Sequence, residues 1–126
     1  MYNFMVDIVR EIVFIELSGS LSIEQIKEYV NDIHQLTLKF ESKRYSMLIL
    51  ANRLDPISQY AIPHFRKAIE KALAWANKIA VVNGNRTITL IQMKRIEAEA
   101  RAIIHSDTKI MRFKTKKEAL IYLCRD

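Results

Sequence analysis

The sequence predicts an α/β domain: a mostly parallel sheet of about five strands, opened by an antiparallel hairpin and packed against four helices. Short runs of β-branched and apolar residues alternate along the chain with longer segments whose apolar residues recur at helical spacing. One short run, residues 47–51, is apolar throughout, which is typical of a central strand buried on both faces. Strands that alternate with helices favour right-handed crossovers and parallel pairing.

Length and composition fit one globular domain over residues 1–126. Half of the residues are hydrophobic, about a quarter are charged, and the chain has only two Gly and two Pro. The single cysteine, Cys124, has no intrachain disulfide partner. Because the sequence shows no signal peptide and no run of membrane-spanning length, we expect a cytoplasmic protein.

The N-terminal third predicts a hairpin and a helix. Residues 2–9 and 12–18 read as two strands joined at Arg10-Glu11, and Gly19 ends the second. Ser22 and Gln25 have the spacing of a capping box, so a helix begins there and runs to about Phe40. Residues 41–44 form an exposed return to the central strand. The predicted inner face of the helix consists of Ile23, Ile26, Tyr29, Val30, Ile33, Leu36 and Phe40.

A second helix is predicted over about residues 58–76, and Pro63 leaves its start open. Proline is tolerated only in the first turn of a helix or at a kink. Either Ser58 caps a helix that bends early, or the regular helix begins near Pro63 after an irregular turn over residues 58–62. We favour the first alternative.

The C-terminal half continues the alternation. A strand over residues 78–82 closes at 83–85, and Thr89 and Gln92 have capping-box spacing for a helix that runs to about Ile104. A short strand over residues 109–113 follows, and Thr115 and Glu118 have capping-box spacing for a last helix through Leu123. The outer face of the third helix is predicted to hold Lys94, Arg95, Glu97, Glu99 and Arg101.

The residues that carry catalysis in proteins do not converge in this sequence. His34, His64 and His105 lie on separate helices or helix ends without metal-ligand spacing, and Cys124 reads as a small buried thiol. Phosphate-binding and nucleophile-elbow glycine motifs are missing, and Asn83-Gly84-Asn85 reads as a simple turn. We therefore expect no enzyme, no cofactor and no metal site.

Positive charge is concentrated near the C-terminus. The net charge is +6, and Lys109, Arg112, Lys114, Lys116 and Lys117 crowd one short segment. A solvated strand edge and helix start explain this cluster best, because charge alone says little about fold. Lys114, Lys116 and Lys117 are the candidates for contact with an anion or an anionic lipid surface. The sequence carries no nucleic-acid-binding motif, so we expect no nucleic acid partner.

The segment after the central strand is the first candidate site, because function in open α/β sheets gathers at the carboxyl ends of strands. Asp55 with Pro56 starts a turn there, and Ser58 follows. A helix cap explains Ser58 most simply. The alternative is that an exposed Ser58 is a phosphorylation point or a partner contact.

The layout resembles the STAS superfamily, which holds the bacterial anti-sigma factor antagonists and their SpoIIAA-like relatives. The resemblance covers almost the full chain. It rests on the opening hairpin, Leu-Ser-Gly19 with Ser-Leu-Ser-Ile23, Asp-x-x-Ser after the central strand, Lys-Ile-Ala-Val-Val82, and Ile-Met-Arg-Phe-x-x-x-x-Glu-Ala-Leu120. It implies a non-enzymatic regulatory module that binds a protein, such as a kinase-like regulator, through the loop after the central strand.

In anti-sigma factor antagonists that loop typically reads Asp-Ser-Ser/Thr-Gly, and a kinase phosphorylates its hydroxyl residue. Here it reads Asp-Pro-Ile-Ser-Gln over residues 55–59, with the acidic residue kept and the Ser-Gly pair missing. The resemblance therefore implies a partner-binding or phosphoacceptor site at Arg53, Asp55, Ser58 and Gln59.

The SpoIIAA-like branch without the phosphorylation motif is the alternative, and Trp75 before the fourth strand is a feature of it. This branch implies a module for an apolar ligand or a membrane surface. Its apolar surface candidates here are Leu54, Ile57, Tyr60, Ile62 and Phe65, although core packing explains these side chains more simply. Peripheral membrane contact belongs to this alternative, and a homodimer is compatible with the sequence.

Overall fold

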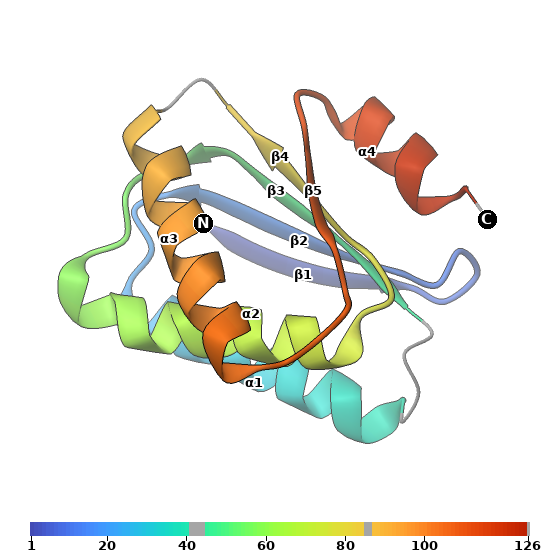
Figure 1. The fold of residues 1–126 in the computed structure, drawn as a ribbon, viewed down its shortest axis with the longest axis horizontal. Coiled ribbons are helices and arrows are strands. Elements are labelled where there is room, and N and C mark those ends of the chain that lie inside the picture. The colour runs from blue at the N-terminus through green and yellow to red at the C-terminus, as the bar shows by residue number, and fades with distance from the viewer. Residues whose placement is uncertain (41–44, 85–86, 126) are drawn as a thin grey trace.

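The protein is described by a computed structural model that covers residues 1–40, 45–84 and 87–125. Its five strands are β1 (Tyr2–Asp7), β2 (Ile12–Gly19), β3 (Ser46–Leu54), β4 (Ile79–Asn83) and β5 (Ile110–Phe113). Its four α-helices are α1 (Ile23–Lys39), α2 (Ile62–Trp75), α3 (Thr87–Ile103) and α4 (Lys116–Leu123) (Figure 1). A 3₁₀ turn, η1 (Gln59–Ala61), precedes α2.

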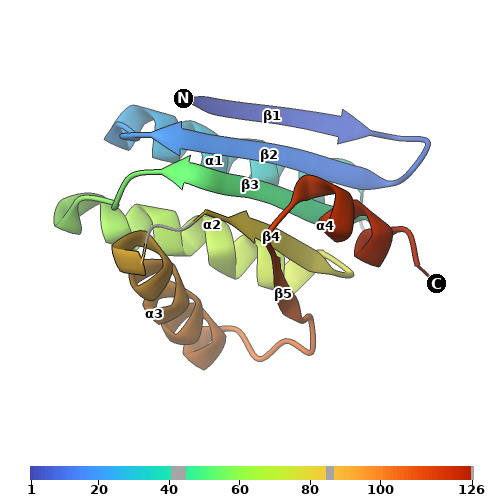
Figure 2. The ribbon, with the colours of Figure 1, turned by 90° about the horizontal axis from the view of Figure 1, so that it is seen from above.

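The strands form one sheet in the order β1-β2-β3-β4-β5, which places β3 at the centre. β1 pairs antiparallel with β2, and every other neighbouring pair is parallel. Helices α1, α2 and α3 cover one face of the sheet, and α4 covers part of the other (Figures 1 and 2). The predicted fold class is confirmed. None of the helices in the described residues is long and apolar enough to cross a bilayer.

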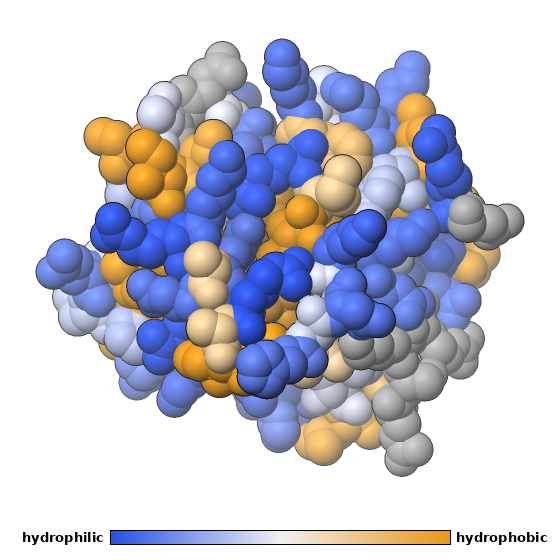
Figure 3. All heavy atoms as spheres, in the orientation of Figure 1, coloured by the Kyte–Doolittle hydropathy of each residue, from blue (hydrophilic) through white to orange (hydrophobic). Residues whose placement is uncertain are grey.

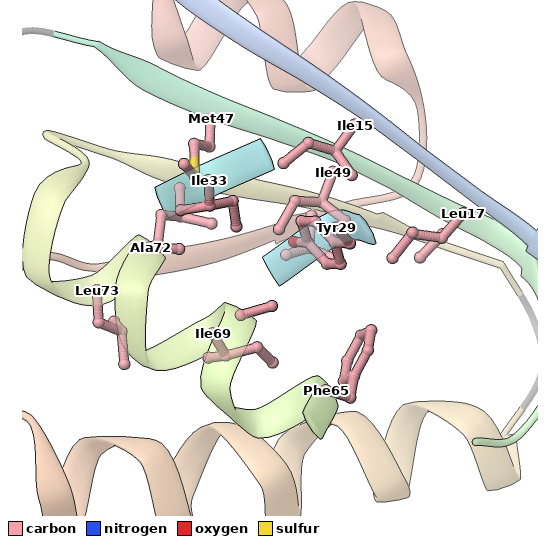
Figure 4. Packing of buried hydrophobic residues seen from close by; sticks show 14 of the residues in the cluster. Ile15, Leu17, Tyr29, Ile33, Met47, Ile49, Phe65, Ile69, Ala72 and Leu73 are labelled. Atoms are coloured by element: carbon pink, nitrogen blue, oxygen red, sulfur yellow. The ribbon is translucent and has the colours of Figure 1, made fainter. Parts of the chain in front are cut away.

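The core lies on both faces of the central strand, as the apolar run of β3 predicts. Met47 and Ile49 face α1 and α2, where they meet Tyr29 and Ile33 of α1 (Figure 4). Leu48 faces the opposite way and packs beneath α4. Because neighbouring side chains of a strand alternate between faces, only a strand covered on both sides can be apolar at every position.

The hairpin between β1 and β2 turns without the Asn-Gly or Asp-Gly pair that usually marks such a connection. Asp7 supplies the turn chemistry, since its carboxylate accepts hydrogen bonds from the backbone N–H of Arg10 at 3.0 Å and from Arg10 Nε at 2.8 Å. These bonds hold the pKa of Asp7 below its ordinary value. Glu11 completes the turn in the left-handed region, at φ 57°.

The first helix follows its sequence signals closely. Ser22 Oγ accepts a hydrogen bond from Gln25 N at 3.1 Å, and Gln25 Oε1 accepts one from Ser22 N at 2.9 Å, so the predicted capping box is confirmed. Gly19 ends β2 at φ +64°, and α1 ends at Lys39. The predicted return over residues 41–44 lies outside the described residues, as does Asn85 of the turn after β4.

The favoured start of the second helix is wrong. Within the described residues the Ser58 side chain makes no cap hydrogen bond, and the 3₁₀ turn η1 separates Ser58 from the regular helix. α2 begins at Ile62 and carries Pro63 in its first turn. Proline fits this position because the first N–H groups of a helix have no partner inside the helix. The second alternative, an irregular turn followed by a helix near Pro63, is correct.

Two predictions near the C-terminus need correction. Glu97 is buried rather than on the outer face of α3, because its carboxylate pairs with Arg112 of β5. Cys124 is exposed rather than buried. Only the Thr115 half of the capping box predicted for α4 is confirmed, since Thr115 Oγ1 accepts a hydrogen bond from Glu118 N at 3.2 Å. The Glu118 carboxylate accepts a hydrogen bond from the Thr115 hydroxyl at 3.0 Å. In a full capping box it would accept one from the backbone N–H of Thr115 instead.

Candidate functional site

The loop that joins β3 to α2 lies at the carboxyl edge of the parallel strands, where the sequence places the candidate site. β3 is longer than predicted and includes Arg53 and Leu54, which pair with Ser18 and Gly19 of β2 beyond a register shift. Asp55 continues this link, because its N–H donates to Gly19 O at 3.0 Å and its carboxylate accepts from Ser20 Oγ at 3.3 Å. Asp55 therefore ties the loop to the end of β2.

Two side chains of α3 hold the other half of the loop. Gln92 bonds both polar groups of Ile57: it accepts from Ile57 N at 2.7 Å and donates to Ile57 O at 2.7 Å. Thr89 Oγ1 donates to Leu54 O at 3.1 Å. The predicted capping box of Thr89 and Gln92 is therefore wrong, since α3 begins at Thr87 and both side chains point to the loop. They pair backbone groups that burial separates from water.

Replacing Gln92 with alanine is expected to loosen this loop. The part-buried N–H and C=O of Ile57 would lose their partners, at a cost of about 1–3 kcal/mol in unfolding free energy. Urea unfolding measures the cost, and hydrogen exchange at the Ile57 amide reports the local opening. The neighbouring Ile91→Ala, at a side chain 58% exposed, serves as the matched control. Unchanged exchange at Ile57 in Gln92→Ala would show that this amide does not depend on Gln92.

The loop divides into buried and exposed residues. Leu54, Ile57 and Phe65 are no more than 5% exposed and belong to the core. The prediction of an apolar surface is therefore wrong for these three. Thr89 and Gln92 bind the backbone of Leu54 and Ile57, whose side chains turn inward, and Phe65 lies on the buried face of α2. Tyr60 differs, with 71% of its surface exposed. The other exposed residues of this segment are Arg53, Pro56, Ser58 and Gln59.

The first turns of α3 extend the exposed part of the loop with residues that the sequence analysis missed. Ile88 and Ile91 are 72% and 58% exposed, and with Gln59 they line a shallow groove of about 340 Å³. Figure 3 shows apolar side chains gathered over this end of α3. We call Gln59, Tyr60, Ile88 and Ile91 the loop-edge patch. The sequence pattern could have predicted their exposure, because Ile88 and Ile91 do not share the helical face of the buried Thr89, Met93 and Ile96.

The C-terminal basic cluster is divided in the structure. Arg112 is engaged with Glu97, whereas Lys114, Lys116 and Lys117 are exposed around the start of α4. Lys116 Nζ lies 5.5 Å from the centroid of the Phe14 ring, on the face of the sheet that α4 covers. The loop-edge patch includes the start of α3, which belongs to the opposite face. The structure therefore does not join the lysines to the loop.

The histidines and the cysteine remain apart. His34 of α1 faces α2, where its Nδ1 lies 3.4 Å from Lys71 Nζ, and His64 and His105 lie elsewhere. Across residues 1–40, 45–84 and 87–125, His, Cys, Asp and Glu form no group of three or more that could hold a metal ion.

Comparison with known proteins places this architecture in a class. The chain has a SpoIIAA-like fold, because its sheet order and helices match solved structures of that fold at TM-scores of 0.58 to 0.72. No protein-family model matches the sequence, and no curated protein matches it either. At 13–16% identity, the likeness to the solved structures concerns the fold.

Three of these structures are informative. An uncharacterised protein of the DUF3478 family from Shewanella loihica PV-4, described as SpoIIAA-like, is 16% identical at TM-score 0.72, over 98% of this chain and 93% of that one. The anti-sigma factor antagonist SpoIIAA in its unphosphorylated form is 13% identical at TM-score 0.63, over 97% and 96%. The Bacillus cell fate determinant SpoIIAA in its phosphorylated form is 16% identical at TM-score 0.58, over 98% and 99%.

Proposed function

We propose that this protein is a non-enzymatic regulatory module that binds another protein through the β3–α2 loop and the loop-edge patch. The observation that carries the proposal is the exposure of Tyr60, Ile88 and Ile91 beside a loop whose backbone is fixed by Thr89 and Gln92. Exposed aromatic and aliphatic side chains on a pre-positioned surface are what a protein partner buries. Arg53 and Asp55 would supply the polar rim of this surface.

The proposal includes regulation at Ser58 by a kinase-like partner. Ser58 is exposed, lies two residues from Tyr60, and does not cap α2. The structures of SpoIIAA in phosphorylated and unphosphorylated forms support phosphorylation on this fold. A phosphate on Ser58 would add up to about two negative charges beside the apolar patch and would oppose docking of an apolar partner surface. A cytoplasmic location belongs to the same proposal.

The test is crosslinked capture of partners by tagged variants in the native cells, followed by mass spectrometry. The patch variant Tyr60→Ala/Ile88→Ser/Ile91→Ser is expected to lower recovery of the partner at least about tenfold relative to the native chain, because it removes the apolar contact area. The control variant Leu38→Ser/Ile121→Ser changes apolar side chains that are 63% and 53% exposed on α1 and α4, and should retain the partner.

Two further variants address Ser58 in the same experiment. Ser58→Asp is expected to lose the partner and Ser58→Ala to keep it, because only the first adds charge to the loop. Equal recovery with both variants would remove the phosphorylation switch. Equal recovery with the patch variant and the control would remove the proposed surface altogether.

The alternative of an apolar-ligand or membrane-binding module has less support. The apolar space among α2, α3 and the sheet amounts to about 10 Å³, about enough for one water molecule, so an apolar ligand would require the helices to move. Lys114, Lys116 and Lys117 are exposed, as contact with anionic lipid requires, and that contact stays a prediction. The structures with this fold named above are a regulator and an uncharacterised protein, which supports the non-enzymatic part of the proposal.

A further inference from the structure

We propose that the free edge of β1 pairs antiparallel with β1 of a second copy of this chain, which joins two sheets into one. β1 is the outermost strand, with β2 on one side. Figure 2 shows β1 along the border of the sheet, away from α4. The proposed function uses the β3–α2 loop and the start of α3, which do not include β1, so the inference is independent of it.

The backbone of β1 offers a regular row of hydrogen-bonding groups to this second copy. Residues opposite each other in an antiparallel pair alternate between bonded and non-bonded pairs. Met1 and Ser18 form a bonded pair, because Ser18 N donates to Met1 O and the Met1 amino group donates to Ser18 O. In the observed register the odd-numbered residues of β1 therefore bond β2. The N–H and C=O groups of Tyr2, Phe4 and Val6 point outward.

The two borders of the sheet are protected to different degrees. Exposed edges invite pairing unless they are short, charged, bulged or interrupted by proline. β5 spans only four residues, Ile110–Phe113, and is flanked by Lys109 and Lys114. β1 spans six residues, contains neither lysine nor proline, and pairs with β2 without a register shift. β1 is therefore the border that is open to another strand.

An apolar groove beside β1 is suited to burial in such a pair. Phe4, Val6 and Ile8 line it together with Leu36 of α1 and Phe40, which follows α1, and it encloses about 250 Å³. Ile8 is 65% exposed. Phe4 and Val6 are half-buried against the core. A copy placed at the edge would cover this groove with an identical apolar surface.

Charge around the groove favours a second copy over an unrelated strand. β1 runs antiparallel to β2, and α1 runs back between the parallel strands β2 and β3, so α1 and β1 run in the same direction. Asp32 therefore lies toward Tyr2, and Lys39 lies toward Ile8. Tyr2 marks the first end, since its hydroxyl donates to Asp32 Oδ2 at 2.6 Å.

A twofold axis through Phe4 reverses one groove relative to the other. Phe4 then pairs with its own copy, and Tyr2 of each protomer pairs with Val6 of its partner. The same axis brings Asp32 of each protomer toward Lys39 of its partner. The surface is complementary to itself in hydrogen bonding and in charge, as a twofold interface requires.

Sedimentation equilibrium of charge variants tests this arrangement. The native chain is expected to show a monomer–dimer equilibrium. Lys39→Asp alone and Asp32→Lys alone each place like charges at both ends of the interface, and each is expected to raise the dissociation constant about tenfold or more. An equimolar mixture of the two variants restores both opposite-charge pairs, so heterodimers should form with affinity near that of the native chain.

A backbone variant separates loss of dimerisation from loss of the fold, which the charge variants alone do not distinguish. Val6→Pro removes an outward N–H and leaves the β2 ladder intact, so it should give a folded monomer by circular dichroism. Met5→Pro, one residue earlier, removes an N–H that bonds β2 and should disturb the fold itself. A native chain that stays monomeric overturns the proposal. So does a dimer that survives Val6→Pro, or a mixture that associates no better than its components.

Discussion

Phe65→Ala is expected to lower the free energy of unfolding by about 3–5 kcal/mol, whereas Tyr60→Ala should change it by no more than about 0.5 kcal/mol. The two aromatic residues are five positions apart and differ in environment. Phe65 is 1% exposed and packs into the core, where its ring centroid lies 6.1 Å from that of Tyr29 (Figure 4). Tyr60 is 71% exposed. Loss of the Phe65 ring leaves a cavity that the surrounding sheet and helices fill only partly.

Urea unfolding of the two variants beside the native chain measures the difference. Domains of this size are stable by about 5–15 kcal/mol, so the loss of Phe65 removes a large share of that margin. Tyr60→Ala should retain native stability and lose only partner binding. Comparable destabilisation by both variants would mean that Tyr60 packs against the protein, and would remove it from the loop-edge patch.

The architecture was predictable because its signals are local. Helical spacing and the Ser22–Gln25 box define α1, and the apolar run of β3 identifies the central strand without knowledge of its neighbours. These features depend on residues three or four positions apart, or on a single strand. Contacts within such short segments need no information about the rest of the chain.

The site was only half predictable because its second half comes from a distant segment. The sequence located the loop at Asp55 and Ser58 from its place after the central strand. The same sequence pattern gave Thr89 and Gln92 a local capping role, whereas their partners, Leu54 and Ile57, lie 35 residues away. A capping box is a weak pattern when a tertiary partner competes for the same side chains.

Burial was also misjudged where a long-range partner decides it. Glu97 looks like an outward residue of α3 by charge alone, and only Arg112 of β5 makes its burial tolerable. Ser58 looked like a cap because helices need one, yet η1 separates it from α2. In both cases the usual preference of the residue type was applied correctly, but the structure around the residue, which decides its role, could not be seen in the sequence.

Gly84→Ala is expected to cost about 3 kcal/mol of stability, because a Cβ at this position would lie 2.3 Å from the backbone oxygen of Asn52 in β3. The carbonyl carbon of Asn52 would lie 3.1 Å away, so the obstacle is backbone, and no side-chain rotation relieves it. Gly84 follows β4 directly, and this close approach brings the ends of the two central strands together. Either β3 or β4 must shift to accept a methyl group.

Gly19→Ala is the matched control, because the two glycines are required for different reasons: Gly84 by close backbone contact, and Gly19 by its backbone conformation. Gly19 has φ +64°, and among the described residues nothing lies within 4 Å of its Cβ position, so alanine there costs only about 1 kcal/mol of backbone strain. Chemical denaturation of both variants compares the loss of unfolding free energy caused by a steric clash at Gly84 with the loss caused by backbone strain at Gly19. A greater loss of stability in Gly19→Ala would show that the ends of β3 and β4 move apart at little cost to accept the methyl group at residue 84. The expected result, a greater loss in Gly84→Ala, would show that the close approach of Gly84 to Asn52 fixes the end of β3, from which the loop with Ser58 and Tyr60 leaves.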